Sequence, residues 1–372
     1  MLRLSKKEVQ MKKYNIGWGL TNACNMNCKF CYSKTARGEL SECKLEDWIR
    51  FLDQNHEYID SINYGTGENS LIPEFFAFVK YAREKYPHIK QSLTTNGFIS
   101  RQIENSKEYF EIFKNCIDEI DVSIDFCVPQ KHNLFRGNSK VFDWAVKTLE
   151  ISKSLNKLCT IVFVGFDETL ELDNLDGLFA LAKKYGALLR MNIYRPVSTN
   201  PEINKKFTLS FEKLTSALNY INEKYEIVAL SDSLLGSVFA GLREVCDNTG
   251  VDSIRILPDG SICPSTYLIS EEYRNKYNIK EENVLKDLIF EVFNQTVVPK
   301  HCKGCQYETT CKGGVLDRRL LWYGTLEERD PYCPKRFDYE FPKTYFKTTK
   351  LSRVSVHDGY LPTLFFKNKD EE

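Results

Sequence analysis

The sequence predicts an α/β protein whose first half is built around a parallel sheet. Between residues 15 and 195, short apolar runs alternate with amphipathic helical patterns. Strand–helix units repeated in this way favour parallel strands joined by right-handed crossovers. Polar signatures also stand directly after the apolar runs, which is where α/β proteins place their ligand sites. The pattern fits both an open doubly wound sheet and an incomplete barrel.

Six buried strands are expected in this part of the chain. They lie at residues 15–21, 61–65, 91–96, 119–125, 159–165 and 188–194. Helical spacing of apolar side chains predicts helices that include Ile72, Val141 and Leu172. The third of these should end at Gly186, because glycine readily adopts the left-handed conformation that closes a helix.

The pattern changes after Pro196. Residues 208–225 and 282–295 are expected to form amphipathic helices, and residues 253–268 a hairpin around a Pro-Asp-Gly turn. The chain is therefore expected to divide into a barrel domain at 1–230, a small cysteine-rich α+β domain at 231–340 and a C-terminal tail without a clear period at 341–372.

The composition excludes several classes of partner. The 372 residues include 51 basic and 51 acidic side chains, so no bulk basic surface is available for nucleic acid or an anionic membrane. No apolar run is long enough to cross a bilayer, and the N-terminus lacks the apolar region of a signal peptide. We expect a cytoplasmic protein. Its 13 cysteines, many of them clustered, are then expected to bind metal rather than to form disulfides.

Three cysteines, Cys24, Cys28 and Cys31, follow the first predicted strand with C-x3-C-x2-C spacing. Three thiolates can hold one face of a [4Fe–4S] cube and leave one iron without a protein ligand. An iron left open in this way can bind a small molecule as well as pass an electron. A zinc site with a distant fourth ligand is the alternative, although zinc sites usually pair their cysteines as C-x2-C.

The stretch "TNACNMNCKFCYSK" (21–34) resembles the signature of the radical S-adenosylmethionine (radical SAM) superfamily, with the aromatic Tyr32 after the last cysteine. The resemblance covers roughly residues 15–195 and implies a partial (β/α)6 TIM-like barrel. It also implies that the open iron binds the amino and carboxylate groups of S-adenosylmethionine (SAM). One electron would then cleave SAM to a 5′-deoxyadenosyl radical, which abstracts a hydrogen atom from a substrate.

The resemblance extends to the ends of later strands. "YGTGENS" (64–70) is similar to the family's GGE motif, which implies contact with the methionine amino group of SAM. Thr66 replaces the middle glycine of that motif. "HNLFRG" (132–137) is similar to a stretch common in peptide-modifying members. The SAM contacts that the resemblance implies are Tyr32, Gly65, Gly67, Glu68, Asn96, Ser123 and Asp125 (the last two toward the ribose), and Arg190 (toward the methionine carboxylate).

A second cysteine group lies near the C-terminus, at Cys302, Cys305, Cys311 and Cys333. Four thiolates can close a [4Fe–4S] cluster or a zinc site. The spacing resembles the SPASM domain, which follows the barrel in many radical SAM peptide maturases and in anaerobic sulfatase-maturating enzymes. Such domains typically carry two auxiliary clusters.

The sequence departs from the SPASM pattern at the inner cluster. Val315 and Ser265 stand where that domain has cysteines, which leaves only Cys246 and Cys263 for the inner site. We therefore expect one auxiliary [4Fe–4S] cluster, on the four cysteines between 302 and 333, with zinc at that site as the alternative.

Two classes of function compete. A radical SAM enzyme that modifies a ribosomally made peptide, by crosslinking, epimerisation or another change, is favoured by the SPASM-like cysteines and by "HNLFRG". A radical SAM enzyme that acts on a sugar or an amino acid is favoured by the single auxiliary cluster. A non-catalytic iron–sulfur or zinc protein would have no use for an open iron beside a GGE-like loop.

The expected partners follow from the chemistry. Flavodoxin or ferredoxin is expected to supply the electron. Only some 14 residues precede the first strand, so a leader-peptide recognition protein would be a separate chain. Epimerisation needs a hydrogen-atom donor, for which Cys127, just past the fourth strand, and Cys263, in the hairpin, are candidates. The alternative for both is a buried thiol that only packs.

Overall fold

Six parallel strands form the centre of a ten-stranded sheet and follow one another in chain order. The computed structural model describes residues 12–34, 41–241, 247, 249–294, 298–342, 355–357 and 362–369. The six strands are β1 (Tyr14–Trp18), β2 (Ile59–Tyr64), β3 (Lys90–Thr95), β4 (Glu119–Ser123), β5 (Leu158–Gly165) and β6 (Leu188–Ile193). A doubly wound sheet reverses its strand order part-way across, whereas this order is continuous. The predicted partial barrel is therefore confirmed.

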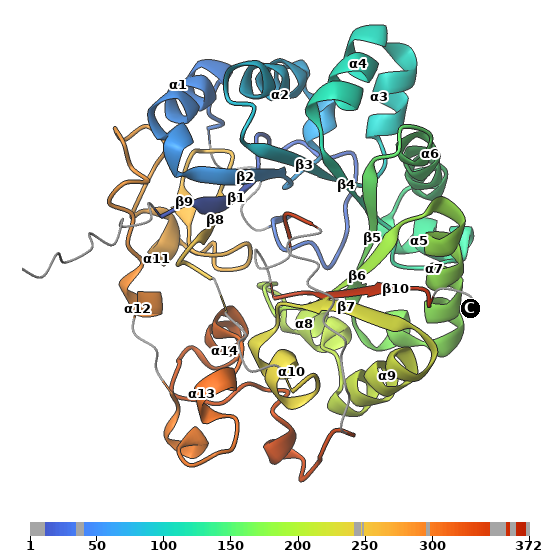
Figure 1. Cartoon of the computed structure of the whole chain (residues 1–372), viewed down its shortest axis with the longest axis vertical. Coiled ribbons are helices and arrows are strands. Elements are labelled where there is room, and N and C mark those ends of the chain that lie inside the picture. Colours follow the sequence, from blue (N-terminus) through green and yellow to red (C-terminus); the bar gives the residue numbers. More distant parts are fainter. Residues whose placement is uncertain are drawn as a thin grey trace, which may run out of the picture.

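Helices surround these strands (Figure 1). They are α1 (Leu45–Asn55), α2 (Pro73–Lys85), α3 (Ile99–Asn105), α4 (Lys107–Cys116), α5 (Pro129–Arg136), α6 (Val141–Ser154) and α7 (Leu172–Tyr185), with 3-10 turns η2 (His56–Tyr58), η3 (Asn69–Leu71) and η4 (Asp167–Leu170). In α7, Leu175, Leu178 and Phe179 are buried at helical spacing. The helix ends at Gly186 in the left-handed conformation, as predicted.

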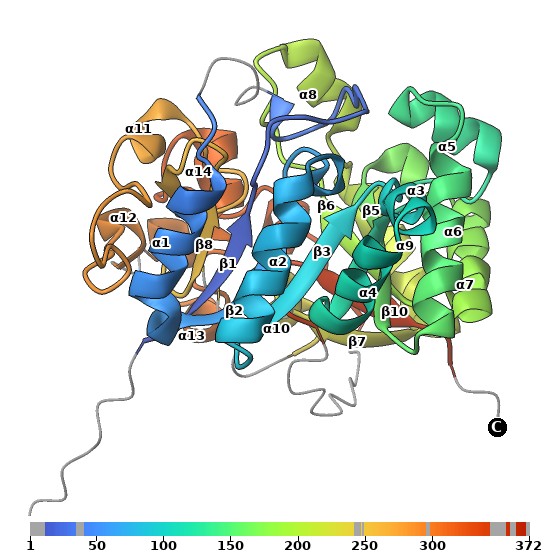
Figure 2. The same cartoon turned by 90° about the horizontal axis from the view of Figure 1, so that it is seen from above.

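The carboxyl ends of the parallel strands meet at one end of the barrel. In Figure 2 the arrowheads of β1 and β3 point to the end at which α5 and α8 (Pro201–Phe207) lie. The loops that carry the polar signatures begin at this end. Parallel pairing thus brings together segments that are far apart in the sequence.

The second half of the chain adds further elements around the barrel. They are α9 (Phe211–Lys224), β7 (Glu226–Leu230), α10 (Ser233–Val238), β8 (Ser253–Ile256), β9 (Ile262–Cys263), α11 (Glu271–Arg274), α12 (Glu291–Asn294), η5 (Lys300–Cys302), α13 (Glu308–Cys311), α14 (Leu316–Tyr323), η6 (Pro334–Arg336) and β10 (Leu364–Lys367). The predicted helix at 208–225 is confirmed as α9.

The predicted hairpin is confirmed as the antiparallel pair β8 and β9. β8 also pairs in parallel with β1, where Asn15 lies opposite Ser253. The hairpin therefore prolongs the barrel sheet beyond β1, and the cysteine-rich segment is joined to the barrel by backbone hydrogen bonds.

One expectation for the second half was wrong. In place of the helix predicted at 282–295, residues 282–294 form turns and only the short α12, and Gln295 lies outside the described residues. Tertiary bonds outweigh the helical pattern: Asn55 accepts from Leu285 N–H at 3.0 Å, and the Leu288 carbonyl accepts from the Tyr14 hydroxyl at 3.3 Å. The tail beyond residue 341 contributes β10, which lies antiparallel between β6 and β7. Both strands beside β10 supply its partners, which a local pattern does not reveal.

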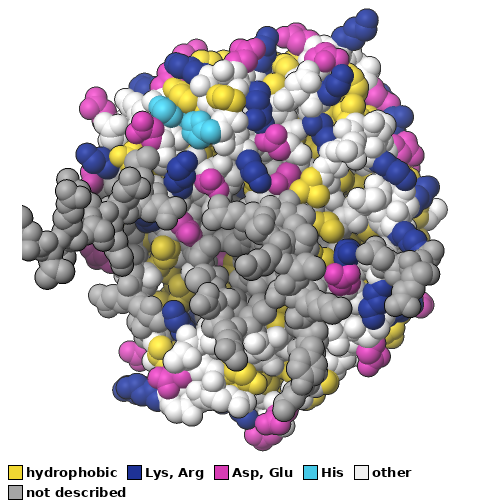
Figure 3. Space-filling model, in the orientation of Figure 1, with side chains coloured by type: hydrophobic (Ala, Val, Ile, Leu, Met, Phe, Trp, Pro, Cys, Tyr) yellow, Lys and Arg dark blue, Asp and Glu magenta, His cyan; other side chains and the backbone are white. Residues whose placement is uncertain are grey.

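The surface agrees with the balanced composition. Basic and acidic side chains are interspersed over the face shown in Figure 3. Among the described residues, no helix combines the length and the apolar character that a bilayer crossing requires.

Candidate active site

The loop after β1 brings the three predicted cysteines to one cavity. Cys24, Cys28 and Cys31 line a cavity of about 190 Å³ at the carboxyl end of the strands. Val141 and Trp144, at the start of α6, pack against the loop. The cysteine side chains therefore have a fixed position relative to the barrel.

A close approach of two loops holds the cysteine loop in place. The Glu68 N–H donates to the Ala23 carbonyl at 2.8 Å. Gly67 has φ +64°, and a Cβ there would lie 2.5 Å from the Ala23 oxygen and 2.6 Å from the Thr21 oxygen. Glycine is required here both by the conformation and by the contact. Thr66, in place of the family's middle glycine, has φ +112°, which is unusual for a β-branched residue.

The structure places the backbone of the GGE-like motif at the cavity and its carboxylate behind it. Gly65 and Gly67 line the cavity, whereas Glu68 does not. The buried Glu68 carboxylate accepts from the hydroxyls of Ser70 at 2.6 Å and Thr95 at 2.9 Å, and from Asn96 N–H at 2.8 Å. Burial raises the pKa of Glu68, and these donors oppose the rise. Glu68 thus connects the ends of β2 and β3.

Asn96 and Tyr32 lie where the sequence predicts, at the cavity. The Asn96 amide donates to the Asn25 side chain at 2.8 Å and so reaches the cysteine loop. The Tyr32 hydroxyl lies 3.4 Å from Thr66 Oγ1. Both contacts join the cysteine loop to neighbouring strand ends.

Ser123 lines the cavity, but Asp125 does not. Asp125 is fully buried and forms an ion pair at 2.7 Å with Arg136 of α5. Its backbone N–H donates to His132 Nδ1 at 3.2 Å. "HNLFRG" is thereby anchored to the end of β4. Arg136 itself lines the cavity. It belongs to the "HNLFRG" motif but was not among the predicted site residues.

The donor set at the cysteine loop fits an iron–sulfur cluster. Burial raises the pKa of Cys28 to about 11, Arg136 opposes this, and the neighbouring Cys31 adds to it. Cysteine binds a metal as the thiolate. A bound iron would therefore have to displace the thiol proton that the raised pKa of Cys28 retains. The Cys28 thiol also lies 3.9 Å from the Arg136 carbonyl, so α5 borders the loop.

Four further basic residues line the cavity, of which the sequence predicted one. Arg190 lines the cavity as predicted and lies 3.3 Å from Asp121. Arg195, Arg255 and His357 also line it. Arg195 lies two residues past β6, and Arg255 lies between the apolar residues of β8. A basic residue just past a strand or inside a buried strand needs a partner, and this feature of the sequence could have indicated Arg195 and Arg255.

Comparison with known proteins gives this cavity its context. The radical SAM superfamily profile matches residues 18–176, which include the cysteine loop and the strand ends around the cavity. Residues 18–176 form a radical SAM domain. Radical SAM proteins use a [4Fe–4S] cluster together with SAM, so the chain is a radical SAM enzyme with these cofactors.

Relatives of this radical SAM enzyme match most of its length. Mycofactocin maturase MftC of Mycobacterium ulcerans is 26% identical over 344 residues, which are 85% of this chain and 86% of MftC. AdoMet-dependent heme synthase of Methanosarcina barkeri is 22% identical over 352 residues, 86% of this chain and 95% of the synthase. The structure of Streptococcus suis SuiB bound to S-adenosylmethionine shares the fold, with a TM-score of 0.69 and 17% identity over 87% of this chain and 77% of SuiB.

Outside the radical SAM barrel, the four C-terminal cysteines of the predicted auxiliary site lie around one pocket. Cys302, Cys305, Cys311 and Cys333 line one small pocket beside α10. In no described group are three or more His, Cys, Asp or Glu side chains placed to share one metal ion. The four thiols still border a common space, and their mutual proximity contributes to the raised pKa of Cys302, after burial.

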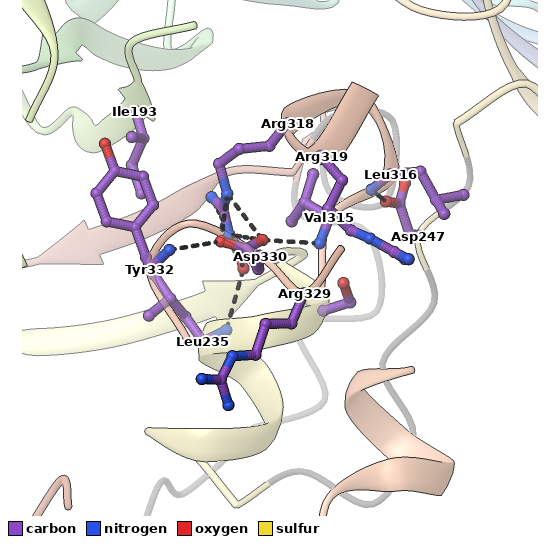
Figure 4. Close-up of polar contacts among 12 residues, drawn as sticks. Ile193, Leu235, Asp247, Val315, Leu316, Arg318, Arg319, Arg329, Asp330 and Tyr332 are labelled. Atoms are coloured by element: carbon purple, nitrogen blue, oxygen red, sulfur yellow. Dashed lines mark hydrogen bonds and ion pairs between the residues drawn. The ribbon is translucent and has the colours of Figure 1, made fainter. Parts of the chain in front are cut away.

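Asp330 organises this pocket (Figure 4). Its carboxylate accepts from the backbone N–H of Val315 at 3.0 Å and pairs with Arg318 at 2.6 Å. Its carbonyl accepts from Cys333 N–H at 3.0 Å. Arg318 also pairs with Asp232, the N-cap of α10, at 2.7 Å. The segment between Cys311 and Cys333 is thus fixed to the barrel side of the molecule.

The two candidate hydrogen donors lie away from the cavity. Cys127 is not part of the cavity lining, and its thiol packs on Gly177 of α7, where a Cβ would meet it at 2.3 Å. Cys263 is fully buried with Leu257 and Ile269. Neither thiol lines the cavity, and both pack against neighbouring residues. Cys246 lies outside the described residues.

Proposed function

We propose that this radical SAM enzyme modifies a ribosomally made peptide, beginning with abstraction of a hydrogen atom. The observation that supports this most is the meeting of the cysteine loop, the Gly65–Gly67 backbone and Arg136 around one cavity. Similarity to the mycofactocin maturase MftC over 85% of the chain agrees with a maturation reaction.

The cavity residues take distinct roles in this proposal. Cys24, Cys28 and Cys31, which line the cavity, would hold the cluster. When bound, the cluster supplies the electron that cleaves SAM to a 5′-deoxyadenosyl radical. The backbone of Gly65 and Gly67 accepts the methionine ammonium.

Further residues position the cofactor from the other strand ends. Asn96 and Ser123 bind its polar groups from the ends of β3 and β4. Glu68 and Asp125, which lie behind the cavity, act by holding Asn96 and Arg136 in position. Their roles differ from the direct contacts that the resemblance implies.

Aromatic side chains exclude water beside the cysteine loop. Phe30 stacks on Phe135 with ring centroids 4.6 Å apart and meets Phe207 edge-on at 5.9 Å. Both partners come from helices at the carboxyl end of the barrel, α5 and α8. A primary carbon radical has to be kept from other hydrogen donors, and a dry aromatic wall serves that purpose.

We also propose one auxiliary [4Fe–4S] cluster on Cys302, Cys305, Cys311 and Cys333. Their common pocket supports this, since four thiols satisfy a cube without an open iron. Such a cluster relays an electron or holds the segment together. At the inner SPASM position, Ser265 caps a turn by accepting from Tyr267 N–H at 3.0 Å, and Val315 is buried.

The proposed partners are a flavodoxin or ferredoxin and a separate leader-peptide recognition protein, in the cytoplasm. Cysteines that cluster without forming disulfides among the described residues agree with a reducing compartment.

The test is anaerobic reaction of the reconstituted enzyme with SAM, reductant and the product of a short reading frame found beside its gene. Perdeuterated peptide should transfer deuterium to 5′-deoxyadenosine, and mass spectrometry should detect a change in peptide mass. The similarity to a heme synthase favours a small molecule as the second candidate. Deuterium transfer from a small metabolite and none from peptide would select it.

A further inference from the structure

Three buried arginines line the cavity with hydrogen-bond donors that have no acceptor. Arg190, Arg195 and Arg255 are 1–2% exposed. Within the described part of the chain, Nε and Nη1 of Arg190, Nη2 of Arg195, and Nε and Nη2 of Arg255 lack a hydrogen-bond partner. Buried guanidinium groups normally have their N–H groups paired, because an unpaired buried donor is costly.

The other atoms of Arg190 and Arg195 are held in place. Arg190 Nη2 lies 3.3 Å from Asp121. Arg195 Nε lies 3.1 Å from Asp317, and its Nη1 donates to the Ile193 carbonyl at 2.8 Å. These contacts orient both side chains and leave the remaining donors for a group in the cavity.

Two tyrosines connect Arg195 to Arg255 across the open edge of the barrel. The Arg195 guanidinium lies 5.3 Å from the Tyr267 ring centroid, and Tyr267 meets Tyr32 edge-on at 5.6 Å. Arg255 lies 5.9 Å from the Tyr32 ring centroid. The row leads from the end of β6 to β8 and borders the cysteine loop at Tyr32.

Arg190 belongs to the same group. His357 also lines the cavity, and its pKa is lowered first by burial and then by the positive charge of Arg190, with a smaller contribution from Arg255. Burial raises the pKa of Tyr267 to about 12, and the positive charges of Arg195 and Arg190 oppose this rise. The three guanidinium groups therefore act on shared neighbours.

The charge of the cavity lining is one-sided. Its described residues include four arginines and no Asp or Glu. Asp125, Asp121 and Asp317 lie behind the lining and pair with Arg136, Arg190 and Arg195 respectively. No described carboxylate pairs with Arg255 in this way. Arg255 therefore carries the surplus positive charge, and it adds to the unpaired donors of Arg190 and Arg195 in the same lining. This arrangement attracts an anion.

The methionine carboxylate of SAM does not account for all of these donors. Arg136 is the arginine that borders the cysteine loop, with its guanidinium 5.4 Å from the Phe30 ring centroid. The two oxygens of a carboxylate accept about four hydrogen bonds. The five unpaired nitrogen donors of Arg190, Arg195 and Arg255 exceed that number and leave room for a second carboxylate.

We propose that Arg190, Arg195 and Arg255 bind a carboxylate of the substrate. Resting on the proposed function, this identifies the substrate as a peptide that presents either its C-terminal carboxylate or an Asp or Glu side chain to the radical site. Guanidinium groups suit this role because their planar forks match a carboxylate.

The test compares small blocked peptides on the reconstituted, SAM-bound full-length enzyme by titration calorimetry. Acetyl-Gly-Gly-Gly with a free carboxyl end is matched with its amide, and acetyl-Gly-Glu-Gly-amide with acetyl-Gly-Gln-Gly-amide. One carboxylate peptide should bind about tenfold tighter than its neutral match, as charge-assisted hydrogen bonds predict. The pair that shows the difference identifies the source of the carboxylate.

Arg255→Gln should abolish this preference and leave the Kd for SAM unchanged. Arg255 suits the test because no described ion pair is broken, and Arg101→Gln, at an exposed side chain of α3, is the control. Equal binding of charged and neutral peptides by the wild-type enzyme would overturn the inference even if the variant does not fold. A loss of SAM affinity in Arg255→Gln would also overturn it. Reductive cleavage of SAM is assayed separately, so failure of the proposed function is seen independently.

Discussion

Arg195 and Asp317 form a fully buried ion pair at 3.1 Å that joins the end of β6 to α14. Ser265 lies 3.4 Å from the other oxygen of Asp317. Ser265 is one of the two positions at which the SPASM pattern expects a cysteine. Ser265 and Asp317 thus form a polar contact network that supports an arginine of the cavity.

Asp317→Asn should destabilise the enzyme by about 3–5 kcal/mol, because it leaves the Arg195 charge buried without its partner. Anaerobic urea denaturation of the reconstituted enzyme measures this loss. Arg50→Gln breaks an exposed pair with Asp47 on α1 and should cost less than about 1 kcal/mol. Equal effects of the two changes would contradict a bracing role for Asp317.

Gly67→Ala and Gly186→Ala separate backbone conformation from loop contact. The two glycines have φ +64° and +66°, so each substitution carries a similar conformational cost of about 1–2 kcal/mol. A Cβ at Gly186 meets nothing within 4 Å, whereas one at Gly67 collides with the cysteine loop. Gly67→Ala alone should lower the rate of SAM cleavage, by roughly 100-fold for a displacement near 1 Å. Similar rates in both variants would refute the close-approach role.

The local patterns of the first half predicted the six strands because each strand is a short apolar run with its own helix after it. Cys24, Cys28, Cys31, Gly65, Gly67, Asn96, Ser123 and Arg190 were predicted at the site and line the cavity. Their positions at strand ends made this possible, since parallel strands bring those ends together.

Long-range contacts explain what the sequence did not reveal. β10 takes its partners from strands more than 100 residues away, and Glu68 and Asp125 look like ligand contacts until their buried hydrogen bonds are seen. Arg255 and His357 reach the cavity from β8 and from the segment before β10. A local motif does not carry that information.

Glu119 should make stability fall as the pH rises from about 4.5 to 7. Burial raises its pKa from 4.5 to about 7, with the negative charge of Asp121 adding to this. Between these pH values Glu119 keeps its proton in the folded protein and has lost it in the unfolded chain. The free energy of unfolding therefore falls by up to ~3 kcal/mol as the pH rises through this range. Its oxygens accept from Val356 N–H, beside His357.

Glu119→Gln is the matched control for this pH effect, since it keeps the shape and removes the titration. The difference in unfolding free energy between wild type and Glu119→Gln should grow between pH 4.5 and 7. A difference that stays constant over this range would exclude Glu119 as the source of the effect.

Iron counting tests the two proposed clusters. The wild-type enzyme should hold about eight irons per chain, four in each cube. Replacing Cys24, Cys28 and Cys31 with Ala should leave about four, and so should replacing Cys302, Cys305, Cys311 and Cys333. About four irons and one zinc in the wild type would eliminate the auxiliary cluster, and about twelve irons would contradict the loss of the inner site.

The most direct test of the account is formation of 5′-deoxyadenosine from SAM under anaerobic reduction with dithionite. The reconstituted wild-type enzyme should form 5′-deoxyadenosine and methionine, and the variant without the 302–333 cysteines should retain some of this cleavage. The variant with Ala at 24, 28 and 31 should form neither product. Absence of 5′-deoxyadenosine from the iron-loaded wild type, or its formation by the triple variant, would contradict the account.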